Sequence, residues 1–148
     1  MCIRDRDDIE FLFSSSDEIP PGSLSKVASG GEISRILLSI ALELSESLKS
    51  KTIIFDEPDI GLGGAIAEKL GQKISSLSKT SQVICISHLP QVAAFADNHI
   101  LIKKNDSEIS KISVSMLNED EKIGEIARML SGETLEDEAY ILAKKMIR

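Results

Sequence analysis

The sequence has no tryptophan, one tyrosine and two cysteines, and it has no apolar run near the ~20 residues that a membrane-spanning helix needs. The cysteines, Cys2 and Cys85, are far apart, and Cys85 lies inside an apolar run. We therefore predict that Cys85 is a small core residue and not half of a disulfide. The first residues lack an apolar stretch of the signal-peptide type. A chain of 148 residues with these features is typical of one soluble cytoplasmic domain.

The sequence also lacks an excess of positive charge. Its formal net charge is −7, whereas proteins that coat DNA concentrate Lys and Arg to displace counterions. Any contact with DNA must therefore come from a local patch or from chain outside this sequence. Many of the acidic residues crowd the last quarter, where they are predicted to form a solvated helical face.

The pattern of apolar residues predicts alternating strands and helices. Strands are expected at 11–13, 52–55, 83–86, 100–102 and around 109–114, and helices at 30–48, 67–77, 90–96, 122–130 and 135–147. Residues 14–25, which contain two adjacent prolines and a glycine, are expected to form a loop. Strands that alternate with helices imply an α/β fold, with a mostly parallel sheet flanked by helices.

Two of these predicted strands, 52–55 and 83–86, are continuous apolar runs that end abruptly in polar residues. This is the pattern of strands buried on both faces of a parallel sheet. Because such strands carry ligand-binding residues at their carboxyl ends, we expect Asp56, Glu57 and His88 to lie together at one edge of the sheet.

Asp56 and Glu57 suit a magnesium–phosphate site. Mg²⁺ keeps several water ligands and takes one or two carboxylates together with phosphate oxygens. Adjacent residues that leave a strand point in different directions, so one acid can face the metal and the other an attacking water. Taken alone, the same residues could simply end a strand at a turn.

The run Ser29-Gly30-Gly31-Glu32 has two interpretations. A serine followed three residues later by a glutamate forms a capping box at the start of a helix. Two glycines in a first helical turn cost stability, however, and would allow a phosphate to approach the exposed N–H groups closely. The pattern alone leaves capping and phosphate contact both open.

His88 follows the second buried strand, level with the two acids. A lone histidine is more often structural, but at this edge it could donate a hydrogen bond to a terminal phosphate. His99 has no such context and is predicted to be structural. The histidines and cysteines are not spaced as a metal-ligand cluster.

A loop that cradles phosphates, of the form G-x-x-x-x-G-K-[ST], is absent from the sequence. None of the nine glycines is followed by a lysine in the required register. The part of a nucleotide hydrolase that holds the nucleotide is therefore missing from this chain.

The order of these motifs resembles that of ABC-type ATPase heads within the P-loop NTPases. The correspondence runs from the signature motif at 29–32 through Walker B at 53–57 and the D-loop at 59–64 to the switch histidine, His88. The chain is most similar to the RecN family, which are SMC-like bacterial DNA repair proteins. Residues 24–35, 87–93 and 125–130 carry this further resemblance.

The resemblance implies a role for each matching residue. Asp56 would hold Mg²⁺ through water, and Glu57 would activate the water that attacks ATP. Ser29, Gly30, Gly31 and Glu32 would form the motif that meets the γ-phosphate of ATP bound to a second head, while His88 would sense that phosphate. Asp59 would line the seam between the two heads.

The resemblance also divides the chain into two parts. Residues 11–148 would form the C-terminal lobe of a head whose Walker A half is missing, and residues 1–10 would be an extension, interpreted as a cloning or assembly scar. Two residues depart from the family pattern. Pro58 replaces an aliphatic residue, and Gly63 stands where serine is more usual, which puts the geometry of the D-loop in question.

These expectations lead to a main hypothesis and to alternatives. The parent protein would pair two heads across ATP while acting on broken DNA, as a nucleoid-associated cytoplasmic ATPase, and this chain alone would be inactive. Its partners would be the N-terminal Walker A half, a second head and DNA, but no membrane. One alternative is an ATP-gated DNA clamp with slow hydrolysis. A less favoured alternative is the nucleotide-binding subunit of a transporter.

Overall fold

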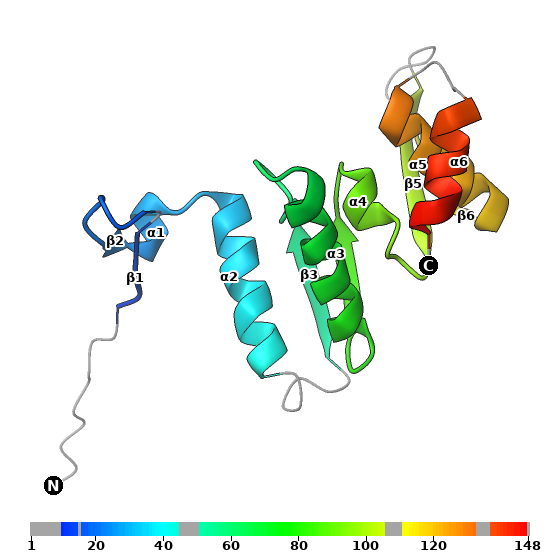
Figure 1. Ribbon diagram of the computed structural model, residues 1–148. Helices are drawn as coiled ribbons and strands as arrows, with labels where there is room; N and C mark the ends of the chain where they lie inside the picture. The colour runs from blue at the N-terminus through cyan, green and yellow to red at the C-terminus, as the bar shows by residue number, and fades with distance from the viewer. Residues whose placement is uncertain (1–9, 15, 45–50, 106–110, 133–136, 148) are drawn as a thin grey trace, which may run out of the picture.

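The computed structural model describes residues 10–14, 16–44, 51–105, 111–132 and 137–147. Over these residues the chain alternates short strands with helices (Figure 1). The elements are β1 (Leu12–Phe13), β2 (Gly22–Ser23), α1 (Leu24–Val27), α2 (Gly30–Glu43), β3 (Thr52–Asp56), α3 (Gly64–Ser78), β4 (Gln82–Ile86), α4 (Pro90–Ala93), β5 (His99–Asn105), β6 (Lys111–Leu117), α5 (Glu119–Ser131) and α6 (Asp137–Met146).

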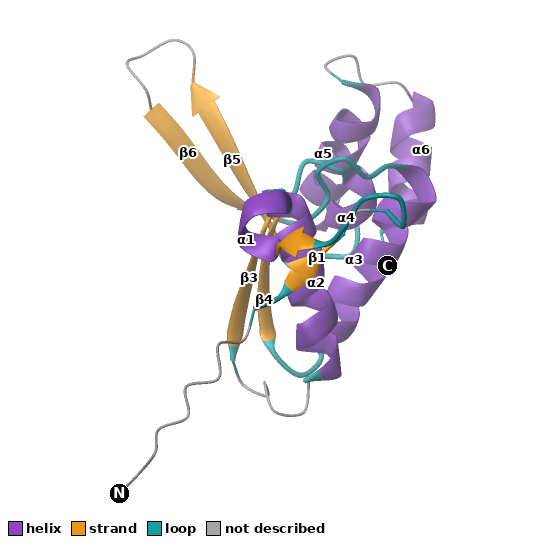
Figure 2. Cartoon of the chain, turned by 90° about the vertical axis from the view of Figure 1, so that its left-hand side faces the viewer, coloured by secondary structure: helices purple, strands orange, loops and turns teal. Residues whose placement is uncertain are grey.

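The longer helices and strands form two layers. Figure 2 shows β3 to β6 on one side of the molecule and α2, α3, α5 and α6 on the other. Three two-stranded sheets are present in the described residues: β1 with β2, β3 with β4, and β5 with β6. The first and third pairs are antiparallel, and β3 and β4 are parallel.

The parallel pair confirms the strand–helix–strand unit predicted from the two apolar runs, with α3 as the crossover. Within the described residues the parallel pairing is limited to β3 and β4, so the predicted mostly parallel sheet is present only as this pair. A parallel connection needs a dozen or more residues, usually in a full helix. Between β4 and β5 the chain forms helix α4, which has only four residues, and β5 pairs instead with the next strand in a local antiparallel ribbon.

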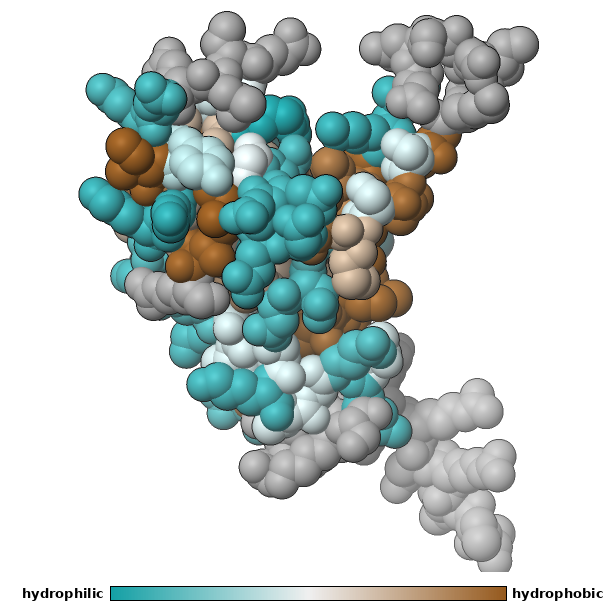
Figure 3. Space-filling view, turned by 90° about the vertical axis from the view of Figure 1, so that its right-hand side faces the viewer, coloured by the Kyte–Doolittle hydropathy of each residue, from teal (hydrophilic) through white to brown (hydrophobic). Residues whose placement is uncertain are grey.

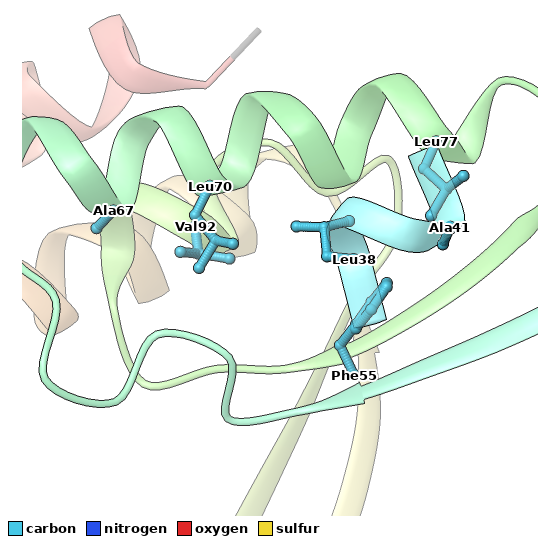
Figure 4. Close-up of a cluster of buried hydrophobic side chains, with 7 residues drawn as sticks. All are labelled: Leu38, Ala41, Phe55, Ala67, Leu70, Leu77 and Val92. Atoms are coloured by element: carbon cyan, nitrogen blue, oxygen red, sulfur yellow. The ribbon is translucent and has the colours of Figure 1, made fainter. Parts of the chain in front are cut away.

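The main hydrophobic core lies between the helices and the parallel pair. Figure 4 shows its seven buried side chains, contributed by α2, α3, α4 and β3. Phe55 on β3 is fully buried against this cluster. Cys85 on β4 packs against its edge, which confirms the prediction that this cysteine belongs to the core. The members are Leu38, Ala41, Phe55, Ala67, Leu70, Leu77 and Val92.

A second, smaller cluster joins α5 and α6. Its buried members are Ala94, Ile126, Ala127 and Ala143. Helix α5 begins three residues before the predicted start because Asn118 and Glu121 form a capping box that closes the first turn. The apolar periodicity could not show this, since the first turn of α5 consists of acidic residues.

The N-terminal part differs from the predicted loop. Residues 22–27 form β2 and α1, which were not predicted because two prolines precede them and β2 itself begins with a glycine. Helix α2 begins at Gly30 as predicted and ends at Glu43. The predicted continuation to residue 48 and most of the predicted extension at 1–10 lie outside the described residues.

One face of the strand layer is apolar and exposed. On β3 and β4, alternate residues turn away from the core, and Ile54, Ile84 and Ile86 are 58%, 46% and 51% exposed. The β5–β6 ribbon carries further exposed apolar side chains, and Figure 3 shows hydrophobic surface along this arm. None of the described helices is both long and apolar enough to cross a membrane.

Candidate functional site

The carboxyl ends of β3 and β4 meet at one edge. Asp56, the last residue of β3, lies opposite Ile86, the last residue of β4. The Glu57 backbone N–H continues this pairing by donating to the carbonyl of Ile86 over 3.0 Å. Because His88 follows Ile86 by two residues, the predicted grouping of Asp56, Glu57 and His88 at one end of the strands is confirmed. The side chains of Asp56 and Glu57 are exposed there.

Glu57 has an unusual backbone conformation. Its φ angle is +44°, the only positive value among the described residues that are not glycine. A side chain in this region costs about 1–2 kcal/mol, and such residues concentrate at functional sites. Pro58 follows directly and is buried, so its ring helps to fix the turn. The chain thus holds an exposed carboxylate on a strained backbone where the strand ends.

The start of α2 has the capping box that the sequence indicated. The backbone N–H of Glu32 donates to Ser29 Oγ over 3.3 Å, and the Ser29 N–H donates to Glu32 Oε2 over 2.7 Å. The hydrogen bond from the Ser29 backbone is the largest cause that lowers the pKa of Glu32. Glu32 is therefore engaged within its own helix, and the structural interpretation of these two residues is confirmed.

The two glycines of this motif have different surroundings. A side chain added at Gly30 would meet nothing within 4 Å. A Cβ at Gly31 would lie 3.2 Å from the Ile60 Cβ and 3.2 Å from Arg35 Nη1. Gly31 therefore allows α2 to pack closely against the loop that follows β3, whereas the surroundings of Gly30 are open to a ligand.

Side-chain hydrogen bonds join α2 to this loop. Ser34 Oγ donates to the carbonyl of Asp56 over 3.1 Å, and Arg35 Nη1 donates to the carbonyls of Pro58 and Ile60, each over 3.2 Å. No role for Ser34 or Arg35 was predicted from the sequence, because their partners lie 22 to 25 residues away along the chain. These contacts fix the glycine-containing start of α2 beside Asp56 and Glu57.

Asp59 is fully buried. Its Oδ2 accepts hydrogen bonds from Ser87 Oγ (2.7 Å) and from the backbone N–H groups of His88 (3.2 Å) and Leu89 (3.1 Å). The same oxygen lies 3.3 Å from Nδ1 of His88. The predicted position of Asp59 at a seam between heads is not tested by these contacts, but its carboxylate is directed inward.

The other oxygen of this carboxylate, Asp59 Oδ1, is buried without a hydrogen-bond partner among the described residues. An unsatisfied buried acceptor costs about 1–3 kcal/mol. Stability alone therefore does not account for a carboxylate at this position.

A magnesium ion at this edge would have few protein ligands. Among the described residues, no group of three or more His, Cys, Asp or Glu side chains could hold a metal ion. The donor set of Asp56 with Glu57 fits Mg²⁺, which takes one or two carboxylates and completes its shell with water and phosphate oxygens.

His99 and Cys85 lie apart from this chemistry. Burial lowers the pKa of His99, with smaller and opposing effects from Glu125 and Lys122. Burial also raises the pKa of the Cys85 thiol to about 12. The thiol is therefore protonated at neutral pH, which makes it a poor nucleophile. Both residues are part of the folded framework.

The chain is similar to bacterial DNA repair proteins named RecN. It is 42% identical to RecN of Rickettsia felis over 142 residues, which are 95% of this chain and 26% of that protein. It is 43% identical to RecN of Bacillus subtilis over 141 residues, 95% of this chain and 24% of that protein. For RecN of Treponema pallidum the values are 39% over 143 residues, 96% and 25%. No family model matches the chain.

Two solved structures resemble the fold. One, from work on the ATP-driven dimerization and DNA-stimulated activation of SMC ATPases, has a TM-score of 0.55 at 21% identity and covers 90% of this chain and 80% of that one. The other is an SMC head bound to the C-winged helix domain of ScpA, with a TM-score of 0.50 at 26% identity, covering 70% of this chain and 31% of that one. The α/β fold of this chain therefore resembles that of SMC ATPase heads.

The sequence match covers nearly the whole of this chain but only about a quarter of the length of its relatives. The chain belongs to the RecN family of DNA repair proteins and corresponds to a C-terminal segment of them.

Proposed function

We propose that this chain is one lobe of an ATPase head that pairs with a second head across bound ATP during DNA double-strand break repair and recombination. The observation that carries this proposal is the convergence of three elements at one edge. Asp56 and Glu57 leave β3, His88 follows β4, and the start of α2 is fastened beside them by Ser34 and Arg35. The RecN relatives support the setting in DNA repair.

The acidic pair would act on ATP and water. Bound Mg²⁺ would neutralise charge on the β- and γ-phosphates. Asp56 would hold this ion through water, while Glu57 would orient and deprotonate the attacking water. The strained backbone at Glu57 supports this assignment, because it presents the carboxylate outward at the end of the strand. His88, with a side chain 56% exposed at the same edge, would donate to the γ-phosphate.

The start of α2 would face ATP held by the second head. Gly30 has open space around its Cα, and the first N–H groups of a helix attract anions. Ser29 adds a hydroxyl group at this point, although it also accepts from Glu32 in the capping box. Capping and phosphate contact are therefore compatible, since the hydroxyl proton of Ser29 stays available to a phosphate oxygen.

The Walker A half of the head would cover the exposed strand face. The strands β3 and β4 are apolar on both faces, yet among the described residues only one face packs against helices. An uncovered row of isoleucines on a two-stranded sheet is unfavourable in water. The RecN relatives have about three quarters of their length outside the matched region, which is enough chain for a second lobe. Alone, this chain would not hydrolyse ATP.

A Glu57→Gln substitution in the full-length protein tests the proposed function. Turnover of ATP should be abolished, while ATP binding persists and the paired heads separate more slowly. A matched control is Glu68→Gln on α3, an exposed acid that is not part of the acidic pair. Unchanged turnover in the Glu57→Gln protein would remove the basis for assigning Glu57 as the catalytic base.

A second candidate is an ATP-gated DNA clamp, in which hydrolysis only resets the clamp. Titration of DNA into an ATPase assay separates the two candidates. No stimulation of turnover, combined with ATP-dependent retention of DNA, would favour the clamp. The RecN match disfavours a transporter subunit. In either form the protein would work on the bacterial chromosome in the cytoplasm.

A further inference from the structure

The proposed mechanism uses His88 but gives no role to its contact with Asp59. Asp59 lies in the loop between β3 and α3, and its side chain is 0% exposed. His88 lies in the turn between β4 and α4, and its side chain is 56% exposed. The buried carboxylate and the exposed imidazole meet through Asp59 Oδ2 and His88 Nδ1, which are 3.3 Å apart.

A structural role accounts for only part of this arrangement. Three of the four groups around Asp59 Oδ2 are the Ser87 hydroxyl and the N–H groups of His88 and Leu89, which together shape the turn. A neutral amide oxygen could accept from the same donors. The negative charge matters specifically to the fourth neighbour, the imidazole ring. The second oxygen, buried without a partner among the described residues, also argues that a carboxylate is kept here for its charge.

The geometry constrains the protonation of His88. With Nδ1 close to a carboxylate oxygen, the stable neutral form of the ring carries its proton on Nδ1. Nε2 then carries no proton. A neutral ring in this state offers only a lone pair at Nε2, which a phosphate oxygen would repel. The ring presents a donor at Nε2 only as an imidazolium, whose charge Asp59 would balance.

We propose that Asp59 is a positioning residue for His88: its carboxylate, 3.3 Å from Nδ1, holds the imidazole ring so that Nε2 is directed toward the phosphate. This inference rests on the proposed function, because it specifies how the phosphate-facing histidine of that site is held. Asp59 touches neither phosphate nor water in this arrangement and acts through His88.

A double-mutant cycle on the full-length protein tests this pairing. Asp59→Asn keeps an oxygen for the turn and removes the charge. It should lower kcat for ATP hydrolysis about tenfold and leave the KM for ATP within about twofold. In a His88→Ala background the same substitution should have no further effect, because its target is gone. An equal loss in both backgrounds, or no loss in the wild-type background, would overturn the proposal. The melting temperature of each variant checks that the turn remains folded.

A spectroscopic measurement decides the pairing independently of turnover. Nitrogen NMR of the full-length protein, labelled at histidine and assigned with His88→Ala, should show a proton on Nδ1 of His88. Asp59→Asn should shift this signal, whereas Ser87→Ala, which removes one donor to Asp59 without removing its charge, should leave the Nδ1 proton in place. A His88 ring protonated mainly at Nε2 in the wild-type protein contradicts the inference. If Glu57→Gln retains turnover, the proposed function fails, and this measurement still tests the Asp59–His88 contact.

Discussion

Arg35 on α2 donates from Nη1 to the backbone carbonyl of Pro58, over 3.2 Å, directly after the acidic pair that ends β3. The same nitrogen donates to the carbonyl of Ile60. One charged side chain thus holds the start of α2 against the loop that contains Glu57 and Asp59. The position of the edge that carries Asp56 and Glu57 depends on this connection as well as on the strands.

We expect Arg35→Ala to weaken both the fold and the site. Loss of two hydrogen bonds from a charged donor should reduce the free energy of unfolding by about 1–3 kcal/mol. Turnover of ATP in the full-length protein should fall as well, because α2 is then free to move away from Glu57. Urea denaturation and an ATPase assay measure the two effects. Lys26→Ala on α1, a basic residue with an exposed side chain, is the control. Full activity in Arg35→Ala would show that the edge does not need this connection.

The two glycines at the start of α2 should respond differently to alanine. Gly31→Ala introduces a Cβ 3.2 Å from the Ile60 Cβ and should destabilise the fold by about 1–3 kcal/mol. Gly30→Ala meets nothing within 4 Å and should leave the stability unchanged or slightly higher. If Gly30 approaches a phosphate, this variant should nevertheless reduce ATP-dependent pairing of heads. Thermal unfolding and sedimentation with ATP separate these effects. Equal stability losses in both variants would contradict the assigned packing.

Much of this edge was predictable from the sequence, because the signals were local. The two apolar runs that are followed by Asp56 and Ser87 indicate strand ends within a few residues. The serine and glutamate of the capping box indicate a helix start in the same way. The contacts of Arg35 and Asp59 were not predictable in this way. Their partners lie 23 to 30 residues away, and only the folded register brings them together.

The sequence predicted a larger parallel sheet than the single β3–β4 pair of the described residues, for a related reason. Apolar strands show that both faces are to be buried, but they do not say which chain segment covers each face. In this chain helices α2 and α3 cover one face, while Ile54 and Ile84 remain exposed on the other. Similarly, residues 22–27 form a strand and a helix too short for any periodicity to reveal.

Gly71 and Gly124 provide a matched test of the packing between helices. Gly71 lies within α3, where an added Cβ would be 2.6 Å from Cδ2 of Phe95 and 3.0 Å from the carbonyl of Gln91. Gly71→Ala should therefore destabilise the fold by about 1–3 kcal/mol. Gly124 lies within α5 with open space around it, so Gly124→Ala should stabilise the fold by up to about 1 kcal/mol. Urea denaturation of both variants measures whether each substitution lowers or raises the free energy of unfolding. A stabilising Gly71→Ala would mean that α3 and the segment after α4 are not in close contact.

Acid should weaken the unit formed by α5 and α6. Hydrogen bonds from Arg128, at 2.6 and 2.9 Å, are the largest cause that lowers the pKa of Glu125 below its ordinary value of 4.5. A carboxyl group with a lower pKa in the folded state stabilises the fold above its unfolded pKa, and this contribution is lost as the pH falls through the folded pKa. The urea midpoint should therefore drop below about pH 4.5, and the drop should be smaller in Glu125→Gln. Glu138→Gln on the exposed face of α6 is the control. Parallel pH profiles for the wild type and Glu125→Gln would contradict this ion pair.

In the proposed function this chain supplies one half of a composite ATP site, and a Walker A half supplies the other. The most direct measurement is ATP hydrolysis by the chain co-expressed with the Walker A half of the same protein. We predict no hydrolysis by either half alone, hydrolysis by the purified complex, and its loss when the chain carries Glu57→Gln. A complex that hydrolyses ATP equally fast with Glu57→Gln, or a chain that hydrolyses ATP without its partner, would show that the ATP site is not divided in this way.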